Sequence, residues 1–197
     1  MIDRIVLDYP NWFVAGGAEE NFKKYLTPYA GKKIKALQIG AYTGDATLWM
    51  FDNILNNSES TLTDVDTWMG SDEPDHKPLN WKSVEEVYDK RFLTQISSGN
   101  LLKMKMTSDD FFLSNKEMYD FIYVDGDHKA ETVLRDGVNA VQCLNPYGII
   151  AFDDYMWSQH KGPAHDPKAA IDAIRLCYSD QFTVLEIGLQ VWMIKNS

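Results

Sequence analysis

The sequence of 197 residues has only two cysteines, Cys143 and Cys177, and no cluster of cysteine with histidine. It therefore lacks the residues for a disulfide framework or a structural zinc site. Both cysteines lie in helix-like stretches. We interpret them as reduced core residues of a protein that works in a reducing compartment.

The sequence also lacks long apolar runs. None approaches the roughly 18 residues that would predict a membrane span. The opening MIDRIVLDYP has no basic region followed by an apolar one, so no signal peptide is predicted. From these absences we expect a cytoplasmic protein that does not bind membranes.

Basic residues are few: 19 Lys and Arg stand against 29 Asp and Glu, which gives a formal net charge of −10. The sequence shows no run of Lys and Arg. A chain this acidic repels phosphate backbones, so nucleic acid is a disfavoured partner, although a single nucleotide remains compatible with it.

What the sequence does contain is an alternation of strand-like and helix-like segments, enough for one domain over residues 1–197 with a helical extension at 1–30. Strands are predicted at 33–39, 60–65, 101–106, 119–124 and 147–152, and two more, joined near Gly188, within 182–195. Helices are predicted at 44–55, 83–92, 108–114, 129–144 and 167–179, and a loop at 66–82.

This alternation predicts an α/β, doubly wound, mostly parallel seven-stranded sheet covered on both faces. The last two strands are too close for a helical crossover, so they must form an antiparallel hairpin. Such a hairpin distinguishes the expected fold from the plain dinucleotide-binding arrangement and favours its methyltransferase variant, a Rossmann-like fold.

A glycine turn, QIGAYTG at residues 38–44, follows the first strand. Gly40 would permit a sharp turn, and Gly44 would let the backbone approach a ligand. The G-x-x-x-G spacing does not fit a dinucleotide pyrophosphate, whereas Asp66, after the second strand, could accept hydrogen bonds from ribose hydroxyls. Together these features suit a nucleoside cofactor such as S-adenosylmethionine. The alternative is that the two glycines are purely structural.

Four aspartates follow the fourth and fifth strands: Asp125, Asp127, Asp153 and Asp154. The two strands are neighbours in this fold, so their ends lie about 5 Å apart. Carboxylates about 6 Å apart repel by roughly 3 kcal/mol at an effective dielectric near 20. Either some retain protons through raised pKa values, or a divalent cation binds; oxygen ligands favour magnesium, calcium or manganese.

Three stretches carry a family resemblance: LQIGAYTGDATLWMFDNIL, TDVDTWMGS, and YDFIYVDGDHKAETVLRDGVNAVQCLNPYGIIAFDDYMW. Together they resemble class I S-adenosylmethionine-dependent methyltransferases, in particular a small soluble group with D-G-D-H and D-D-Y motifs. The resemblance covers the chain from about residue 35 to its end. Two positions depart from that group: Gln38 stands in place of the usual Glu, and Pro146-Tyr147-Gly148 in place of Pro-Gly-Gly.

The resemblance, which extends to metal-dependent sugar and catechol O-methyltransferases, implies a small-molecule or glycan hydroxyl as methyl acceptor. It implies Mg²⁺ or another hard divalent cation, held by Asp125, Asp153 and Asp154, with Asp127 or His128 as general base. The cofactor-binding residues it implies are Gln38, Gly40, Ala41, Tyr42, Gly44, Asp66, Thr67, Trp68, Asp125, Gly126 and His128.

Several alternatives stay open. Asp127 could cap the helix that begins near residue 129, and His128 could pack against the cofactor. Trp68 and Trp81 could stack on a ligand or pack in the core, and Trp157 could line an acceptor pocket or lie on the surface. A catalytically silent S-adenosylmethionine-binding module is the alternative function, and a nicotinamide-dependent oxidoreductase is less favoured. The oligomeric state is not predicted.

Overall fold

The computed structural model describes residues 9–197. Residues 1–8 lie outside the described part. Most of the opening stretch, for which no signal peptide is predicted, therefore lies outside it too. The helices and strands, in chain order, are α1 (Trp12–Ala15), α2 (Ala18–Leu26), η1 (Thr27–Tyr29), β1 (Lys35–Ile39), α3 (Asp45–Asn53), β2 (Thr61–Asp66), α4 (Trp81–Ser98), β3 (Leu101–Lys105), α5 (Ser108–Ser114), β4 (Tyr119–Val124), α6 (Ala130–Gln142), β5 (Leu144–Phe152), η2 (Pro163–His165), α7 (Lys168–Cys177), β6 (Phe182–Ile187) and β7 (Val191–Lys195).

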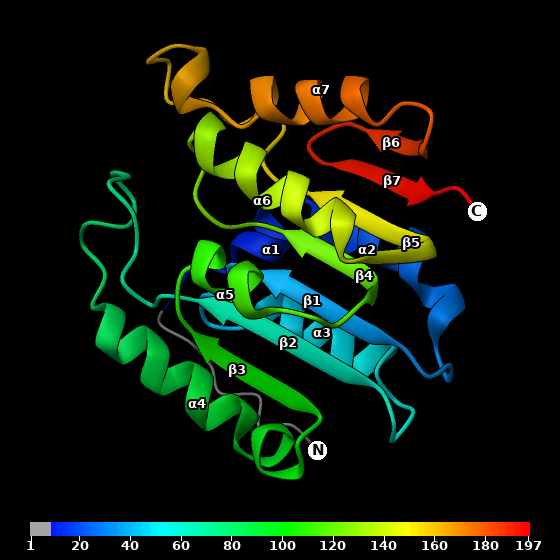
Figure 1. Ribbon diagram of the computed structural model, residues 1–197. Helices are drawn as coiled ribbons and strands as arrows, with labels where there is room; N and C mark the ends of the chain where they lie inside the picture. The colour runs from blue at the N-terminus through cyan, green and yellow to red at the C-terminus, as the bar shows by residue number, and fades with distance from the viewer. Residues whose placement is uncertain (1–8) are drawn as a thin grey trace.

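One seven-stranded sheet, in the order β3-β2-β1-β4-β5-β7-β6, runs through the molecule (Figure 1). The pairs from β3 to β5 are all parallel, and β7 pairs antiparallel with both β5 and β6. The predicted fold class and its C-terminal hairpin are therefore confirmed. The strand order reverses between β1 and β4, where ligands bind in sheets of this kind.

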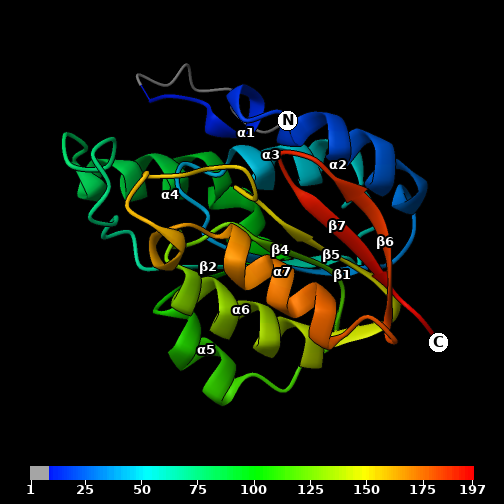
Figure 2. The same ribbon diagram turned by 90° about the horizontal axis from the view of Figure 1, so that it is seen from above.

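Helices cover both faces of the sheet, with α2, α3 and α4 on one side and α5, α6 and α7 on the other (Figure 2). Strand β4 shows why both layers form. Phe121 and Tyr123 pack in the core under the first layer, while Ile122 packs in the core under the second. Because side chains alternate along a strand, a continuous apolar run such as FIYV fills both cores.

The N-terminal helices belong to the first of these cores. Phe22 of α2 is fully buried and lies edge-on against Phe121, Tyr123 and Trp192, with ring centroids 4.9 to 5.6 Å apart. Such aromatic pairs each contribute about 0.5–1.5 kcal/mol beyond burial of their area. The extension is thus packed on the sheet, and it carries α1 to the edge where the strands end.

Two predicted helix and strand boundaries differ from the structure by more than two residues. Helix α4 continues to Ser98, past the predicted end at Phe92, where its backbone bends, and it stops at Gly99 with a φ of 80°. Strand β5 begins at Leu144, so the residues predicted as a turn continue the strand, with an irregular register before Ile149.

The interpretation of the cysteines as core residues is wrong for Cys177, whereas Cys143 packs against the second core. Cys177 is exposed at the end of α7 and Cys143 is half-buried after α6, and both are free thiols. Among the described residues, no helix is long and apolar enough to cross a membrane.

Candidate active site

The register of the parallel strands aligns the ends of β1, β4 and β5. Ile39 lies opposite Val124, and Val124 lies opposite Phe152. The ladder continues one residue further, since the backbone N–H of Asp125 donates to the carbonyl of Ile39 (2.8 Å) and that of Asp153 to the carbonyl of Val124 (3.0 Å). The predicted meeting of aspartates at one edge of the sheet follows directly from this alignment.

Gly40 brings the β1–α3 turn against the end of β4. Its φ is +86°, and a Cβ there would lie 1.8 Å from the carbonyl oxygen of Asp125. Gly44, with a φ of +85°, makes room instead for Phe92, which a Cβ would meet at 2.2 Å. The close approach that Gly44 permits is therefore to helix α4 and not, as expected, to a ligand.

Asp66, at the end of β2, organises this turn. Its Oδ2 accepts hydrogen bonds from the backbone N–H groups of Ala41 (2.8 Å) and Tyr42 (2.9 Å), and its Oδ1 accepts from that of Trp68 (2.7 Å). Asp66, Ala41, Tyr42 and Thr67 all line the main cavity. The carboxylate predicted to bind ribose thus holds the backbone of the glycine turn.

Gln38, which lies deep in β1, supports the same turn. Its side-chain amide donates to the carbonyl of Gly40 (2.7 Å) and accepts from the hydroxyl of Thr47 (3.3 Å), and it is 2% exposed. A neutral amide can both donate and accept, whereas an ionised Glu could only accept. Gln38, which stands where the family usually has Glu, therefore donates a hydrogen bond to the turn that an ionised Glu could not donate.

A cavity of about 1010 Å³ opens at this edge. Gly40, Asp66, Asp125 and Gly126 line it, and so do side chains that come from elsewhere in the chain: Trp12, His76, Trp81, Met156, Trp157 and Leu189. Its volume is at the upper end of the roughly 300–1,000 Å³ typical of ligand pockets, so it has room for two ligands.

Trp68, a predicted cofactor-binding residue, lies outside the cavity lining. It is 3% exposed, packs against Tyr88 at 4.9 Å between ring centroids, and donates its indole N–H to the carbonyl of Tyr42. Of the alternatives left open for Trp68, packing is the one that the structure supports. Trp157, in contrast to Trp68, lines the cavity.

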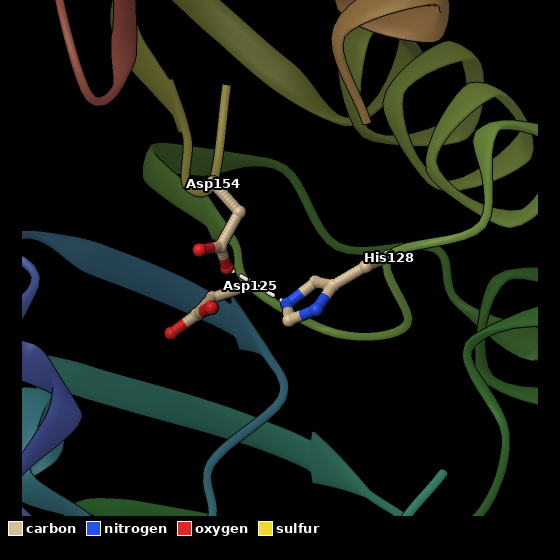
Figure 3. Close-up of side chains that lie close together, drawn as sticks. All are labelled: Asp125, His128 and Asp154. Carbon is tan, nitrogen blue, oxygen red and sulfur yellow. Dashed lines mark ion pairs between the residues drawn. The ribbon is translucent and has the colours of Figure 1, made fainter. Parts of the chain in front are cut away.

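Three side chains meet beside the cavity: Asp125, His128 and Asp154 (Figure 3). One donor atom from each lies within 4.8 Å of the others, and Nε2 of His128 is 2.7 Å from Oδ2 of Asp154. Asp154 has a φ of +56°, a left-handed conformation that costs a non-glycine residue about 1–2 kcal/mol. Such strain is commonly found at functional sites.

The structure groups other side chains than the predicted metal-binding set. Asp153 lines the cavity, but its Oδ1 accepts from the side chain of Gln190 (3.0 Å) and the backbone of Asp154 (2.9 Å), and its Oδ2 accepts from the hydroxyl of Tyr123. His128, and not Asp153, completes the group with Asp125 and Asp154.

Burial and like charge perturb this site. Burial, with the charges of Asp153 and Asp154, raises the pKa of Asp125 well above its usual range, and burial raises that of Asp153 to about 6. Burial alone would lower the pKa of His128, but contacts with Asp154 and Glu73 raise it well above its usual value. These two carboxylates therefore favour the imidazolium form of His128.

Asp127, the other predicted general base, is engaged in local structure. Its Oδ2 accepts from the hydroxyl of Thr132 (2.9 Å) and its Oδ1 approaches the backbone N–H of Lys129 (3.5 Å), at the start of α6. Asp127 is therefore tied to the start of α6, although no side chain in the described part of the chain caps that helix.

Sequence reasoning missed Glu73, which lies between β2 and α4. Its Oε1 is 3.1 Å from Nδ1 of His128, off the line of the N–H bond, so the contact is an ion pair and not an aligned hydrogen bond. The loop around it has no periodicity that could have marked this residue.

Comparison with known proteins identifies the class. Residues 37–155, more than half of the chain, match the model of a family described as "Methyltransferase domain". The chain belongs to this family, and it is a class I S-adenosylmethionine-dependent methyltransferase. No curated protein matches it.

Solved structures share its fold at low sequence identity. A candidate rRNA methylase from Clostridium thermocellum aligns with a TM-score of 0.67 at 10% identity, covering 91% of this chain and 96% of that one. The O-methyltransferase TomG from Streptomyces achromogenes, in complex with SAM, gives 0.62 at 11%, covering 98% and 93%. An O-methyltransferase from Bacillus cereus, in complex with SAH, gives 0.58 at 12%, covering 97% and 94%.

Proposed function

We propose that this protein transfers the methyl group of S-adenosylmethionine to a hydroxyl oxygen of a small molecule or glycan, with the assistance of a divalent cation. One observation carries the proposal: the glycine turn, Asp66 and the group Asp125, His128 and Asp154 all face one cavity. Methyl donor and acceptor can therefore meet where the carboxylates converge. O-methyltransferases among the structural neighbours support this choice.

The nucleoside end of the cofactor would lie along residues 40–42 and Asp66. The two oxygens of Asp66 already accept three backbone N–H groups. A carboxylate offers about four acceptor positions, so one position is left for a ribose hydroxyl. Thr67 and Gly126 line the cavity beside this point and would contact the same nucleoside.

The acidic residues fit a divalent cation. Asp125 and Asp154 present carboxylate oxygens with the imidazole of His128 beside them, and burial makes the like charges costly when no cation compensates them. A bound cation would lower the pKa of the acceptor hydroxyl and orient its oxygen. Carboxylate oxygens suit Mg²⁺ or Mn²⁺, so Asp125 and Asp154 would hold the cation and the imidazole of His128 would stay free to accept a proton.

His128 is the proposed proton acceptor. It starts as an imidazolium between Asp154 and Glu73, and a positive sulfonium brought into the cavity lowers its pKa through like-charge repulsion. The neutral ring can then take the hydroxyl proton at Nε2, a role worth about 10²–10⁴-fold in rate. The remaining task of the site is to hold nucleophile and methyl near 3 Å and in line.

The charge of the cavity limits the acceptor. Two basic residues, Lys129 and Arg135, line it together with these acidic ones: Asp45, Asp66, Asp72, Glu73, Asp75, Asp109, Asp125, Asp127, Asp136, Asp153 and Asp154. A field of this sign repels phosphate groups and attracts cations. We therefore favour a neutral or cationic hydroxylated acceptor over a phosphorylated one or a nucleic acid.

Calorimetric titration with S-adenosylmethionine and with NAD tests the cofactor, and binding of the first alone is expected. Release of S-adenosylhomocysteine with a panel of hydroxylated acceptors then tests catalysis. Tight cofactor binding with no turnover on any acceptor would favour a silent binding module instead.

The cation is tested by stripping divalent ions with a chelator and assaying methyl transfer before and after adding back Mg²⁺ or Mn²⁺. Turnover should fall on stripping and return with the metal. Undiminished turnover in chelator would remove the cation from the proposal and leave methyl transfer intact.

A further inference from the structure

A buried carboxylate interrupts the apolar face of α6. The buried positions of this helix are Val133, Asp136, Gly137, Ala140 and Val141, and of these five only Asp136 is charged. Asp136 is 2% exposed, and aspartate is almost never fully buried unless it is paired. Its position on the face of α6 that packs against the sheet therefore needs an explanation.

The protein itself supplies few partners for this carboxylate. Oδ1 of Asp136 is buried and has no hydrogen-bond partner in the described part of the chain. Arg135, the adjacent residue, pairs with Asp109 instead (3.2 Å). Burial raises the pKa of Asp136 to about 6, and the hydroxyl of Ser108 opposes this rise only in part. At neutral pH Asp136 is therefore mostly ionised, with a free acceptor position that a ligand could use.

Asp136 borders the cavity at the turn that follows β3. Thr107 and Ser108 of that turn line the same cavity, and so does Gly126. A Cβ on Gly126 would lie 3.8 Å from Oδ2 of Asp136, so the missing side chain leaves this oxygen uncovered on that side. Asp64 also has a buried oxygen without a partner among the described residues, but Asp64 does not line the cavity. Of the two, Asp136 is the one that a ligand can reach.

The order of the strands places this part of the cavity next to the proposed ribose position. Strand β2 lies between β3 and β1, and the backbone N–H of Met106, just after β3, donates to the carbonyl of Asp66 at the end of β2 (3.1 Å). The ends of β4 and β5, where the methyl group would be transferred, lie on the other side of Asp66. With the ribose at Asp66 and the sulfonium toward β4, the base would lie toward β3, beside Asp136.

The chemistry of a carboxylate suits one edge of adenine. An ionised carboxylate only accepts hydrogen bonds. Adenine carries a donor, its 6-amino group, on the ring edge that points away from the ribose. A carboxylate at the far end of a base pocket therefore attracts adenine, and it repels a purine that has a carbonyl oxygen at that position.

We propose that Asp136 selects the base of the cofactor by accepting a hydrogen bond from the 6-amino group of adenine. The inference rests on the proposed function, because it takes the ribose to lie at Asp66. Asp136 is a specificity-determining residue that touches the base and takes no part in methyl transfer. The carboxylate is kept in the core for a donor that the cofactor brings.

The test measures the binding of two ligands to the full-length protein by calorimetry. The ligands are S-adenosylhomocysteine and its analogue in which hydrogen replaces the 6-amino group. Because hydrogen bonds to charged groups are among the stronger ones, the wild type should bind the first ligand about 10–100-fold more tightly. Asp136→Leu keeps the branching of the side chain and removes both acceptors, so the two ligands should bind it with nearly equal affinity. Asp180→Leu, at an exposed position after α7, should keep the wild-type preference.

The stability of the ligand-free protein separates this role from a structural one. Asp136→Leu replaces a buried carboxylate that lacks a full set of partners, so its melting temperature should equal or exceed that of the wild type. A carboxylate that served only the fold would give the opposite result, a lower melting temperature and an unchanged preference for the amino group. Asp136→Asn, whose amide oxygen still accepts, should show an intermediate preference.

An unchanged preference in Asp136→Leu would overturn the inference, and so would a wild type that binds both ligands equally. If Asp136→Leu does not fold, Asp136→Asn takes its place and must lose part of the preference. Normal turnover by a wild type without the preference would contradict the inference alone. The expected preference with no turnover on any hydroxylated acceptor would contradict the proposed function and leave the role of Asp136 standing.

Discussion

Two aspartates with raised pKa values, Asp64 in β2 and Asp125 after β4, differ in their surroundings: Asp64 is fully buried, and Asp125 is half-buried at the cavity. Burial raises the pKa of Asp64 to about 7, and burial with the charges of Asp153 and Asp154 raises that of Asp125 well above its usual range. Neither value alone shows which carboxylate belongs to an active site.

Their neighbours distinguish them. Oδ2 of Asp64 accepts hydrogen bonds from the hydroxyls of Thr47 and Tyr88, both at 2.6 Å, under the layer of α3 and α4. Asp125 faces the cavity beside two further carboxylates. Oδ1 of Asp64 has no partner among the described residues, so this acid is held only through Oδ2, by hydroxyls of the core, which is a structural role. A buried acid beside other acids and open space indicates a place for a cation or a reacting group.

The largest expected effect is on turnover, and it concerns the group of side chains around Asp125. Replacing His128 with Gln removes the proposed proton acceptor, so kcat should fall by about 10²–10⁴-fold. S-adenosylmethionine binding, measured by calorimetry, should stay near the wild-type value. His160→Gln, at an exposed position in the loop after β5, is the control. Normal turnover in His128→Gln would assign the proton transfer to another group.

A smaller effect, on stability, is expected at Asp64. Asp64→Ala leaves the hydroxyl of Tyr88 without its acceptor and leaves that of Thr47 only the longer contact with Gln38 (3.3 Å), and an unsatisfied buried group costs about 1–3 kcal/mol. We expect urea unfolding to show a loss of about 1–3 kcal/mol, with turnover per folded molecule close to normal. Asp180→Ala, at an exposed position, should change neither quantity. Loss of turnover with unchanged stability in Asp64→Ala would contradict the structural role of Asp64.

A further expected effect at Asp64 is the pH dependence of stability. The folded-state pKa of Asp64, about 7, is raised above its unfolded value, so the folded protein binds the proton more tightly. Its contribution to stability is fully present below about pH 4 and is lost as pH rises through 7. Melting temperatures measured in chelator from pH 4 to 8 should therefore fall less steeply in Asp64→Asn than in Asp180→Asn. Equal slopes of melting temperature against pH in the two variants would contradict a raised folded-state pKa at Asp64.

Much of the fold could be predicted because its signals are local. The run YDFIYV predicts β4 at 119–124, where the structure has it, since a short apolar run between polar turns leaves few alternatives. The end of α4 was missed because the backbone bends at Phe92 and the helix continues beyond it. Cys177 was wrongly predicted to be buried. Which face of a helix is exposed depends on the elements that pack against it, and a single sequence does not show these.

The candidate site could be predicted only as far as backbone position determines it. Strand order places Asp125 and Asp153 side by side, as expected. Which carboxylates turn toward His128 depends on the left-handed φ of Asp154 and on the donors that hold Asp153, and neither has a sequence pattern. Glu73 contacts a residue 55 positions away in the chain (128 minus 73). Only the folded structure brings such a pair together.

The most direct test of the site is the release of S-adenosylhomocysteine by Asp125→Asn, with an acceptor that the wild type methylates. The carboxylate of Asp125 would face both the cation and the acceptor. Its loss should therefore lower turnover by at least roughly 100-fold, the loss associated with groups that only support a metal-binding residue. Asp180→Asn should retain normal turnover. Wild-type turnover in Asp125→Asn, with the cofactor still bound, would contradict an active site at the ends of β4 and β5.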